Sequence, residues 1–262
     1  MNSWEAEHLI RHLDDLVSRD KHNDETLSQE IFRSLKFGIN FDSAVMNFCL
    51  VEQDFRLPEL KSFYYKQPQT MALNYQKTSQ SDNYSPNLLL LNGKALDGLS
   101  CLDVDQYLES PFYLDHCRYF DVQNALGVAG RFPGHMRKYL VLYLFASDKG
   151  RLFSDQDVTL VDRVFPIIFL IWQCRYGLIC HETLINRIQL LELFANKPRM
   201  LELIRLVVQN PFATAKEYAR QMQCSERTVE HQFSALFDML NISGYNKNKK
   251  IELYQRFQFL AP

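Results

Sequence analysis

Apolar residues recur at a spacing of three or four near both ends of the chain. This helical periodicity predicts amphipathic helices over 4–17, 25–37, 155–180 and 182–194. Ser154 and Asp157 form a predicted capping box at the start of the third helix, where each satisfies a backbone N–H of the first turn. In the last quarter of the chain, helices are predicted over 200–208, 214–222, 225–240 and 251–257.

The middle of the chain changes to short apolar runs. Residues 41–51 and 62–65 predict strands, and 110–128 reads as a helix that carries into a strand. The run at 139–146 is apolar throughout, which predicts a central strand. The remaining segments are predicted as a polar loop at 78–86, a short buried run at 87–92, a short helix at 102–108 and a polar turn at 243–250.

These elements predict an α+β N-terminal domain followed by an all-α four-helix domain. We place the first domain at 1–180, a connecting helix with a linker at 181–197, and the second domain at 198–262.

The stretch 213–240 contains two helices joined by a sharp turn. Thr214 and Glu217 form a capping box, and Ser225 is a good N-cap for the second helix. One side of the second helix is apolar (Val229, Phe233, Leu236, Leu240), and the opposite side is polar (Arg227, His231, Ser234, Asp238). This pattern predicts a helix-turn-helix, in which the second helix enters the major groove of DNA. An ordinary helical hairpin is the alternative.

The residues around this turn resemble a known family. Ser225-Glu226-Arg227-Thr228-Val229, with Glu217-Tyr218-Ala219 before it and Leu240-Asn241-Ile242 after it, is similar to the helix-turn-helix of LuxR-type (NarL/FixJ-like) transcription regulators. The chain has Glu230, Gln232 and Met239 where that family usually has Lys, His and Lys. Neutralisation of phosphates dominates affinity for DNA. The loss of these cations leaves three alternatives: DNA binding is weak, it uses other cations, or it has been lost.

The resemblance implies two sets of DNA contacts. Base edges would be read by three outward side chains, namely Arg227, His231 and Ser234. Phosphates would be held by Thr228, Gln232, Lys216, Arg220, Lys247, Lys249 and Lys250. For the three lysines after the second helix, a solvated turn is the alternative.

A second resemblance covers the second half of the N-terminal domain. The motifs Pro111-Phe112-Tyr113, Tyr119-Phe120-Asp121-Val122, Leu126-Gly127-Val128 and Phe153-Ser154-Asp155-Gln156-Asp157 are similar to those of GAF-like sensor domains. That likeness implies an apolar ligand pocket, with Tyr113, His116, Arg118 and Tyr119 as candidate ligand contacts; core packing or surface exposure is the alternative for each. The Trp-x-x-x-Tyr and Asp-Pro pattern of acyl-homoserine-lactone domains is missing, so that ligand is not predicted.

Composition and charge narrow the function. The net charge of the 262 residues is −2, but the part from Asn196 to the end has ten Lys and Arg against six Asp and Glu, so +4 lies there and −6 before it. A basic module on an acidic body fits a nucleic-acid reader. The six cysteines have no Cys-x-x-Cys spacing and predict free thiols in a reducing cytosol. The longest apolar run, 164–172, is about half the length that spans a bilayer.

No enzyme motif, cofactor site or metal site is predicted. We therefore expect a cytoplasmic bacterial transcription regulator that senses an unidentified small molecule or partner, binds double-stranded DNA and acts as a homodimer. The predicted dimer surface combines the apolar helix 155–172 with the connecting helix around 184–191. The alternative is a protein-interaction adaptor whose degenerate helix-turn-helix no longer binds DNA.

Overall fold

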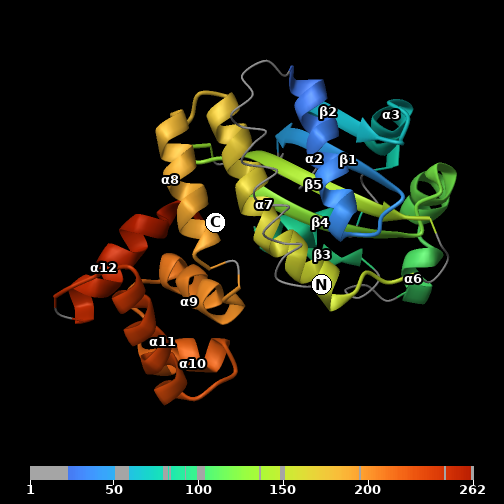
Figure 1. Ribbon diagram of the computed structural model, residues 1–262. Coiled ribbons are helices and arrows are strands. Elements are labelled where there is room, and N and C mark those ends of the chain that lie inside the picture. Colours follow the sequence, from blue (N-terminus) through green and yellow to red (C-terminus); the bar gives the residue numbers. More distant parts are fainter. Residues whose placement is uncertain are drawn as a thin grey trace. The chain divides into compact units, whose positions relative to one another are not determined.

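The computed structural model describes residues 23–50, 59–78, 82, 84–91, 93–98, 104–135, 137–147, 151–194, 196–244 and 246–260. The chain divides into two compact units, Met1–Gln189 and Leu190–Pro262 (Figure 1). Helix α8 (His181–Glu192) runs across this division along the sequence. The predicted helix at 4–17 lies outside the described residues. No helix in the described part of the chain is long and apolar enough to cross a membrane.

The first unit contains a five-stranded sheet with the order β2-β1-β5-β4-β3. Its strands are β1 (Ser43–Leu50), β2 (Glu59–Tyr65), β3 (Leu96–Asp97), β4 (Asn124–Arg131) and β5 (Lys138–Ala146). Every neighbouring pair is antiparallel. The central position of β5 confirms the prediction from its apolar run, because a strand with layers on both faces buries nearly all its side chains. The mixed α+β class predicted for this part of the chain is confirmed.

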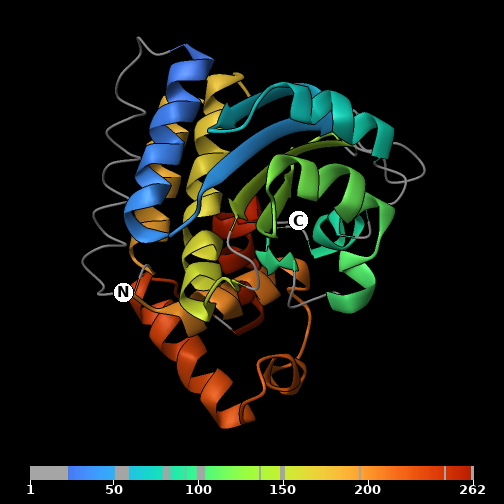
Figure 2. The same cartoon turned by 90° about the vertical axis from the view of Figure 1, so that its right-hand side faces the viewer.

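Two long helices cover one face of the sheet. They are α2 (Asp24–Gly38) and α7 (Asp155–Arg175), seen beside the strands in Figure 2. Trp172 of α7 is fully buried, and its ring lies 5.0 Å from Phe48 of β1 and 5.5 Å from Phe63 of β2. Aromatic pairs of this kind add to the area-dependent gain from burial. They bind the helix layer to the two strands at one side of the sheet.

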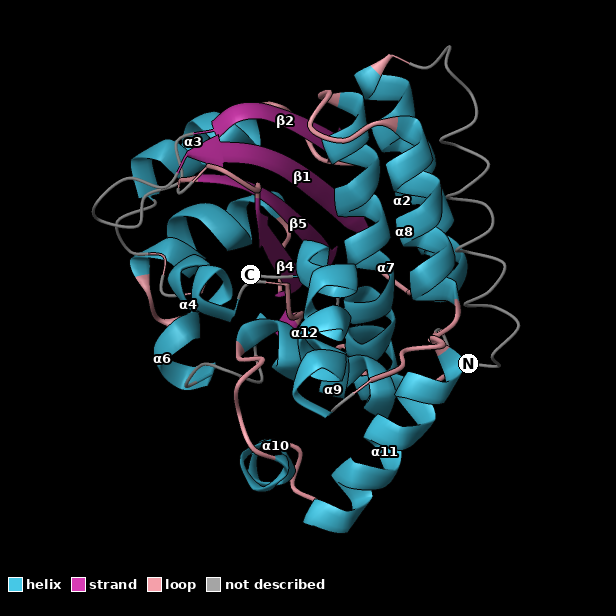
Figure 3. Cartoon of the chain, turned by 90° about the vertical axis from the view of Figure 1, so that its left-hand side faces the viewer, coloured by secondary structure: helices cyan, strands magenta, loops and turns pink. Residues whose placement is uncertain are grey.

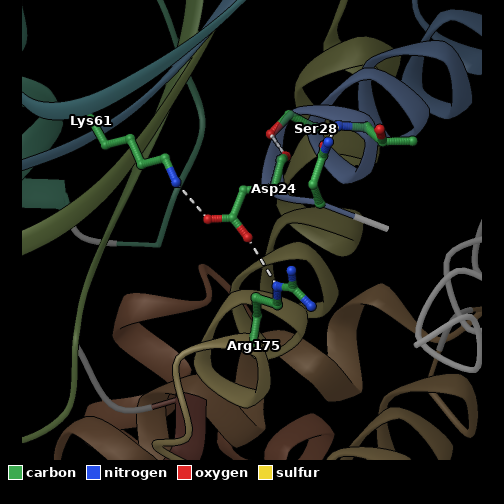
Figure 4. A network of polar contacts seen from close by, with 6 residues as sticks. Asp24, Ser28, Lys61 and Arg175 are labelled. Atoms are coloured by element: carbon green, nitrogen blue, oxygen red, sulfur yellow. Dashed lines mark hydrogen bonds and ion pairs between the residues drawn. The ribbon is translucent and has the colours of Figure 1, made fainter. Parts of the chain in front are cut away.

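An ion-pair network joins α2, α7 and β2 (Figure 4). Asp24 begins α2, and its carboxylate accepts hydrogen bonds from Lys61 Nζ at 2.5 Å and Arg175 Nε at 2.9 Å. Burial opposes the charged form of Asp24, but the hydrogen bonds from the two cations outweigh it and lower the pKa of the carboxyl.

Local hydrogen bonds determine where α7 begins and ends. Ser154 and Asp157 make the predicted reciprocal capping box at the start of α7. The helix ends at Arg175, five residues before the predicted end, because Gly177 takes a left-handed φ of +68°. The N–H of Leu178 then donates to the carbonyl of Gln173 at 2.8 Å, which closes a Schellman motif.

Shorter helical segments cover the second face of the sheet. They are α3 (Thr70–Thr78), α4 (Ser85–Leu91), α6 (Val104–Leu108), the π-helical turn η2 (Tyr113–Cys117) and the 3-10 turn η3 (Arg118–Phe120). The predicted loop 78–86 is wrong at both ends, since Thr78 belongs to α3 and α4 begins at Ser85. The run 87–92 is also only half buried: Leu88 and Leu89 face inward while Leu90 is exposed, as the helical period requires.

The described secondary-structure elements of the second unit are helices joined by loops (Figure 3). It contains α9 (Pro198–Gln209), α10 (Ala215–Gln221), α11 (Glu226–Met239), α12 (Asn246–Phe257) and the 3-10 turn η4 (Gln258–Leu260). The predicted capping box of Thr214 with Glu217 and the predicted N-cap at Ser225 are confirmed. The predicted polar turn 243–250 is wrong in its second half, because Asn246 already begins α12.

The connection between α10 and α11 is short and is held by backbone hydrogen bonds. Gln223 adopts a left-handed φ of 52°, and the N–H of Cys224 donates to the carbonyl of Ala219 at 2.9 Å. These features form a Schellman motif that ends α10. Ser225 follows the motif directly, and its hydroxyl accepts from the N–H of Thr228 at 3.1 Å and caps α11.

The apolar side chains that define the predicted dimer surface are buried within a single chain. The apolar side chains of α7 that would form it, among them Ile167, Ile168 and Ile171, are at most 3% exposed within a single chain. Leu184 and Ile188 of α8 are buried to the same degree. Helical periodicity placed these apolar side chains on one face of each helix. It could not show that other parts of the same chain cover that face.

Replacing Gln223 with glycine is expected to stabilise the second unit. An L-residue in the left-handed region costs about 1–2 kcal/mol, and glycine removes this cost. Part of the gain is lost because glycine has more conformational freedom in the unfolded chain. We expect a net gain of about 0.5–1 kcal/mol, measured as slower amide hydrogen exchange in α10 and α11.

Gln221→Gly is the matched control for this substitution. Gln221 is exposed like Gln223 but is the last residue of α10, where glycine relieves no left-handed strain and should cost up to about 0.5–1 kcal/mol. Equal effects of the two substitutions would contradict the assigned turn geometry.

Candidate functional site

The second face of the sheet encloses a cavity. Its volume, measured as the space open to the centre of a water-sized sphere, is about 60 Å³. A single water needs about 10–15 Å³ on such a measure, so several waters or a small organic fragment can fit. The walls are rich in aromatic rings, and they consist of Val45, Asn47, Tyr64, Met71, Tyr75, Tyr84, Ser85, Tyr107, Phe112, His116, Cys117, Val122, Ala125, Tyr143 and Phe145.

Strand alternation decides which side chains reach the cavity. Successive residues of a strand point to opposite faces, so Val45 and Asn47 of β1 line the cavity while Met46 and Phe48 belong to the other face. Gly127 of β4 lies on the cavity face, where a Cβ atom would come within 2.7 Å of the Tyr84 hydroxyl. The absence of a side chain at this position lets the helical layer approach the sheet closely.

Asp82 fixes the layer above the sheet. Its carboxylate accepts from the Tyr75 hydroxyl at 2.8 Å and from the backbone N–H groups of Tyr84 at 2.8 Å and Ser85 at 3.1 Å. Burial, together with the negative charge of Asp82, raises the pKa of Tyr75 well above its ordinary value. The Ser85 hydroxyl also pairs with the Tyr143 hydroxyl of β5 at 2.8 Å, which ties α4 to the sheet.

His116 lies in the wall of the cavity and is neutral at physiological pH. Its Nδ1 is 2.7 Å from Asn74 Oδ1 of α3, and its ring stacks on Phe112 at 5.2 Å. Burial lowers the pKa of the imidazole to about 4, because the charged form is poorly solvated there. The hydrogen bond joins α3 to η2.

Cys117 contributes a protonated thiol to the wall. Its Sγ lies 3.3 Å from the Tyr107 hydroxyl, and burial raises the pKa of the thiol to about 12. Because the thiolate is the reactive form of cysteine, this side chain is an unreactive lining group. The described residues contain no cluster of His, Cys, Asp and Glu that could hold a metal ion.

The four predicted ligand contacts lie in different environments in the structure. His116 lines the cavity. Tyr113 is buried nearby, where its hydroxyl donates to Gln123 at 2.5 Å, but it is not a wall residue. Tyr119 is 74% exposed, and Arg118 is exposed as well, so neither reaches the cavity.

Most wall residues were missed by sequence reasoning. Asn47 and Tyr143 lie on predicted strands, where a period of two could have shown that they share a face. The contributions of α3 and α4 had no comparable signal, since the sequence 57–76 was ambiguous and 78–86 was predicted as a loop.

The N-terminal half of α11 presents polar side chains to solvent. Arg227, Thr228, His231 and Ser234 are exposed, while Val229, Phe233, Leu236 and Leu240 are buried. The Thr228 hydroxyl lies 2.7 Å from the Ser225 hydroxyl at the cap. Lys216 is exposed on α10, and Gln232 is half-buried with its Oε1 lacking a hydrogen-bond partner.

A groove of about 380 Å³ lies beside this face. Its walls carry charge of both signs and consist of Ala215, Glu230, Phe233, Ser234, Phe237, Asp238, Lys249 and Lys250. Lys250 Nζ donates to the carbonyl of Ala213 at 2.7 Å, and Lys249 Nζ lies 5.3 Å from the centre of the Phe237 ring. Both predicted phosphate contacts therefore have partners within the unit, and the side chain of Lys247 lies outside the described part.

Comparison with known proteins gives distant likenesses. No family model and no curated protein matches the chain. The VqsR LBD domain of Pseudomonas aeruginosa is similar at 11% identity and a TM-score of 0.49, over 68% of this chain and 98% of that one. CepR2 of Burkholderia cenocepacia, an N-acylhomoserine lactone dependent LuxR family transcription factor, gives 10% identity and a TM-score of 0.42, over 60% and 87%. Escherichia coli SdiA gives 15% and 0.36 over 99% of both chains. These values are too low to place the chain in a family.

Acid is expected to weaken the first unit through His116. The folded-state pKa of about 4 lies below the ordinary value of 6.5, so the unfolded chain binds the proton more tightly. The free energy of unfolding should therefore fall by up to about 3 kcal/mol as the pH drops through that window. Urea titrations across this window, compared between the wild type and His116→Gln, isolate the contribution. Identical pH slopes in the two proteins would show that His116 is not buried in the neutral form.

Proposed function

We propose that this chain is a DNA-binding transcription regulator whose N-terminal unit senses a small molecule or a partner. In this proposal, residues 1–180 form a GAF-like sensor domain, 181–197 a connecting segment, and 198–262 a LuxR-type helix-turn-helix domain. The protein acts in the bacterial cytoplasm as a homodimer without a cofactor and is not an enzyme.

The observation that carries the proposal is the geometry of α10 and α11. The Schellman motif at Gln223 and the cap at Ser225 fix a tight turn between two short helices, and the second helix exposes its polar N-terminal half. This is the arrangement in which a recognition helix reads the major groove with its first turns. Arg227 and His231 are then the proposed base contacts, and Ser234 is placed one turn further along.

The charge around α11 limits the affinity. Thr228, Gln232 and Lys216 remain proposed phosphate contacts, with Lys247, Lys249 and Lys250 at the start of α12. Lys250, however, must exchange its bond to Ala213 for a phosphate, and Glu230 is exposed beside the groove. Because each neutralised phosphate adds to affinity, this surface supports modest binding at physiological salt.

The aromatic cavity supports the sensing part of the proposal. It is concave and mostly apolar with a few polar groups, which is the usual character of a small-molecule site. His116 stays in this proposal as a ligand contact, whereas Tyr113 supports the wall from behind and exposed Tyr119 takes no part in the cavity.

The adaptor remains the alternative. Two residues support it, Glu230 and Met239, because each stands where LuxR-type regulators usually have a lysine. The Sδ atom of Met239 lies 3.5 Å from Lys197 Nζ. An adaptor of this kind would present the groove beside α11 to a protein.

Arg227→Ala is expected to weaken duplex binding by about 1–3 kcal/mol if this side chain contacts a base. Fluorescence anisotropy of the full-length protein against a pool of native promoter fragments, at two salt concentrations, measures the effect. Arg33→Ala on α2 is the control, because Arg33 is an exposed surface arginine paired only with Glu30 in its own helix. A folded protein that binds no duplex at either salt concentration would favour the adaptor.

Glu230→Lys is expected to strengthen binding and to make it more dependent on salt. One added phosphate contact should steepen the slope of log K against log salt by about 0.9. The same titrations give this slope. An unchanged slope would mean that α11 does not approach the backbone of the duplex.

A further inference from the structure

In the described part of the cavity wall, one buried polar atom lacks a hydrogen-bond partner. Asn47 Oδ1 is buried in the cavity wall and accepts no hydrogen bond. The other polar groups of the wall have partners in the protein, as described above for Tyr75, Ser85, Tyr107, His116 and Tyr143. A buried acceptor without a donor is costly and calls for an explanation in each case.

Asn47 cannot escape the cavity by a local change in the sheet. It lies in the middle of β1, which pairs with β2 on one side and β5 on the other, opposite Ser62 and Val141. A shift of the strand by one residue would move Phe48 into the cavity and Asn47 into the layer that contains Trp172. The register therefore holds the amide at the cavity wall, on the same face as Val45 and Cys49.

The walls also restrict the charge of an occupant. Among the described residues of the wall there is no Lys or Arg, and His116 is neutral, so an anion finds no counter-charge there. Asp82, whose carboxylate lies behind Tyr75 and Tyr84, would repel an anion further. Eight of the fifteen wall residues have aromatic rings, which favour an apolar and preferably aromatic body.

We propose that Asn47 Oδ1 is the polar anchor for an uncharged small molecule that has an apolar or aromatic body and one O–H or N–H donor. The donor replaces the partner that the fold does not supply, and the body occupies the space between the aromatic rings. This inference rests on the sensing role proposed above and specifies the ligand class for that site.

Phenol and toluene test the anchor, because they share one ring and differ in a hydroxyl against a methyl group. Isothermal titration calorimetry or ligand-observed NMR with the full-length protein gives the ratio of their affinities. We expect the ratio to shift by about tenfold toward toluene in Asn47→Leu, the effect of losing one buried hydrogen bond. Asn40→Leu is the control, because Asn40 is exposed and is not a wall residue, so the same change there should leave the ratio unchanged.

A second measurement does not depend on the probes. Leucine branches at Cγ as asparagine does and leaves no acceptor unpaired, so Asn47→Leu should unfold at a higher temperature than the wild type without ligand. The same affinity ratio in wild type and Asn47→Leu, or no binding of either probe to the wild type, would overturn the proposal. Promoter binding is independent of these results, so failure of the anchor is distinguishable from failure of the regulator function.

Discussion

Burial of the sheet on both faces is the constraint on which the rest of the first unit depends. Because side chains alternate along β1, β4 and β5, each strand supplies one row to the helices α2 and α7 and another row to the cavity. Trp172 fills the first layer, packed against Phe48 and Phe63. The second layer closes less completely, and the aromatic cavity is the space that remains between its short helical segments and the sheet.

The size of the cavity limits which ligands it can hold without a change in the structure. At about 60 Å³ it is well below the volume of a site for a drug-sized ligand. A larger ligand would have to displace the layer formed by α3, α4 and η2, which is held by the contacts of Asp82 and by the bond between His116 and Asn74. These contacts lie between short segments rather than within a long helix, so the layer is the part of the unit best suited to respond to a ligand.

Strong local signals made much of the architecture predictable. The period of α11, the caps at Thr214, Ser225 and Ser154, and the apolar run of β5 each follow from a few neighbouring residues, and all are confirmed. The cavity was less accessible, because its wall brings together residues about a hundred positions apart. Likewise Lys249 and Lys250, predicted in a loop, lie on α12, since neither propensity nor period predicted a helix start at Asn246.

The central claim is that paired copies of α11 read duplex DNA. In vitro selection by the full-length protein from a random duplex library tests it most directly, at salt between about 50 and 200 mM, where phosphate contacts are most clearly resolved. The account predicts enrichment of a two-fold repeat with half-sites about one helical turn apart. A folded protein that enriches no sequence at the lower salt would contradict it and would leave the groove beside α11 as a surface for a protein partner.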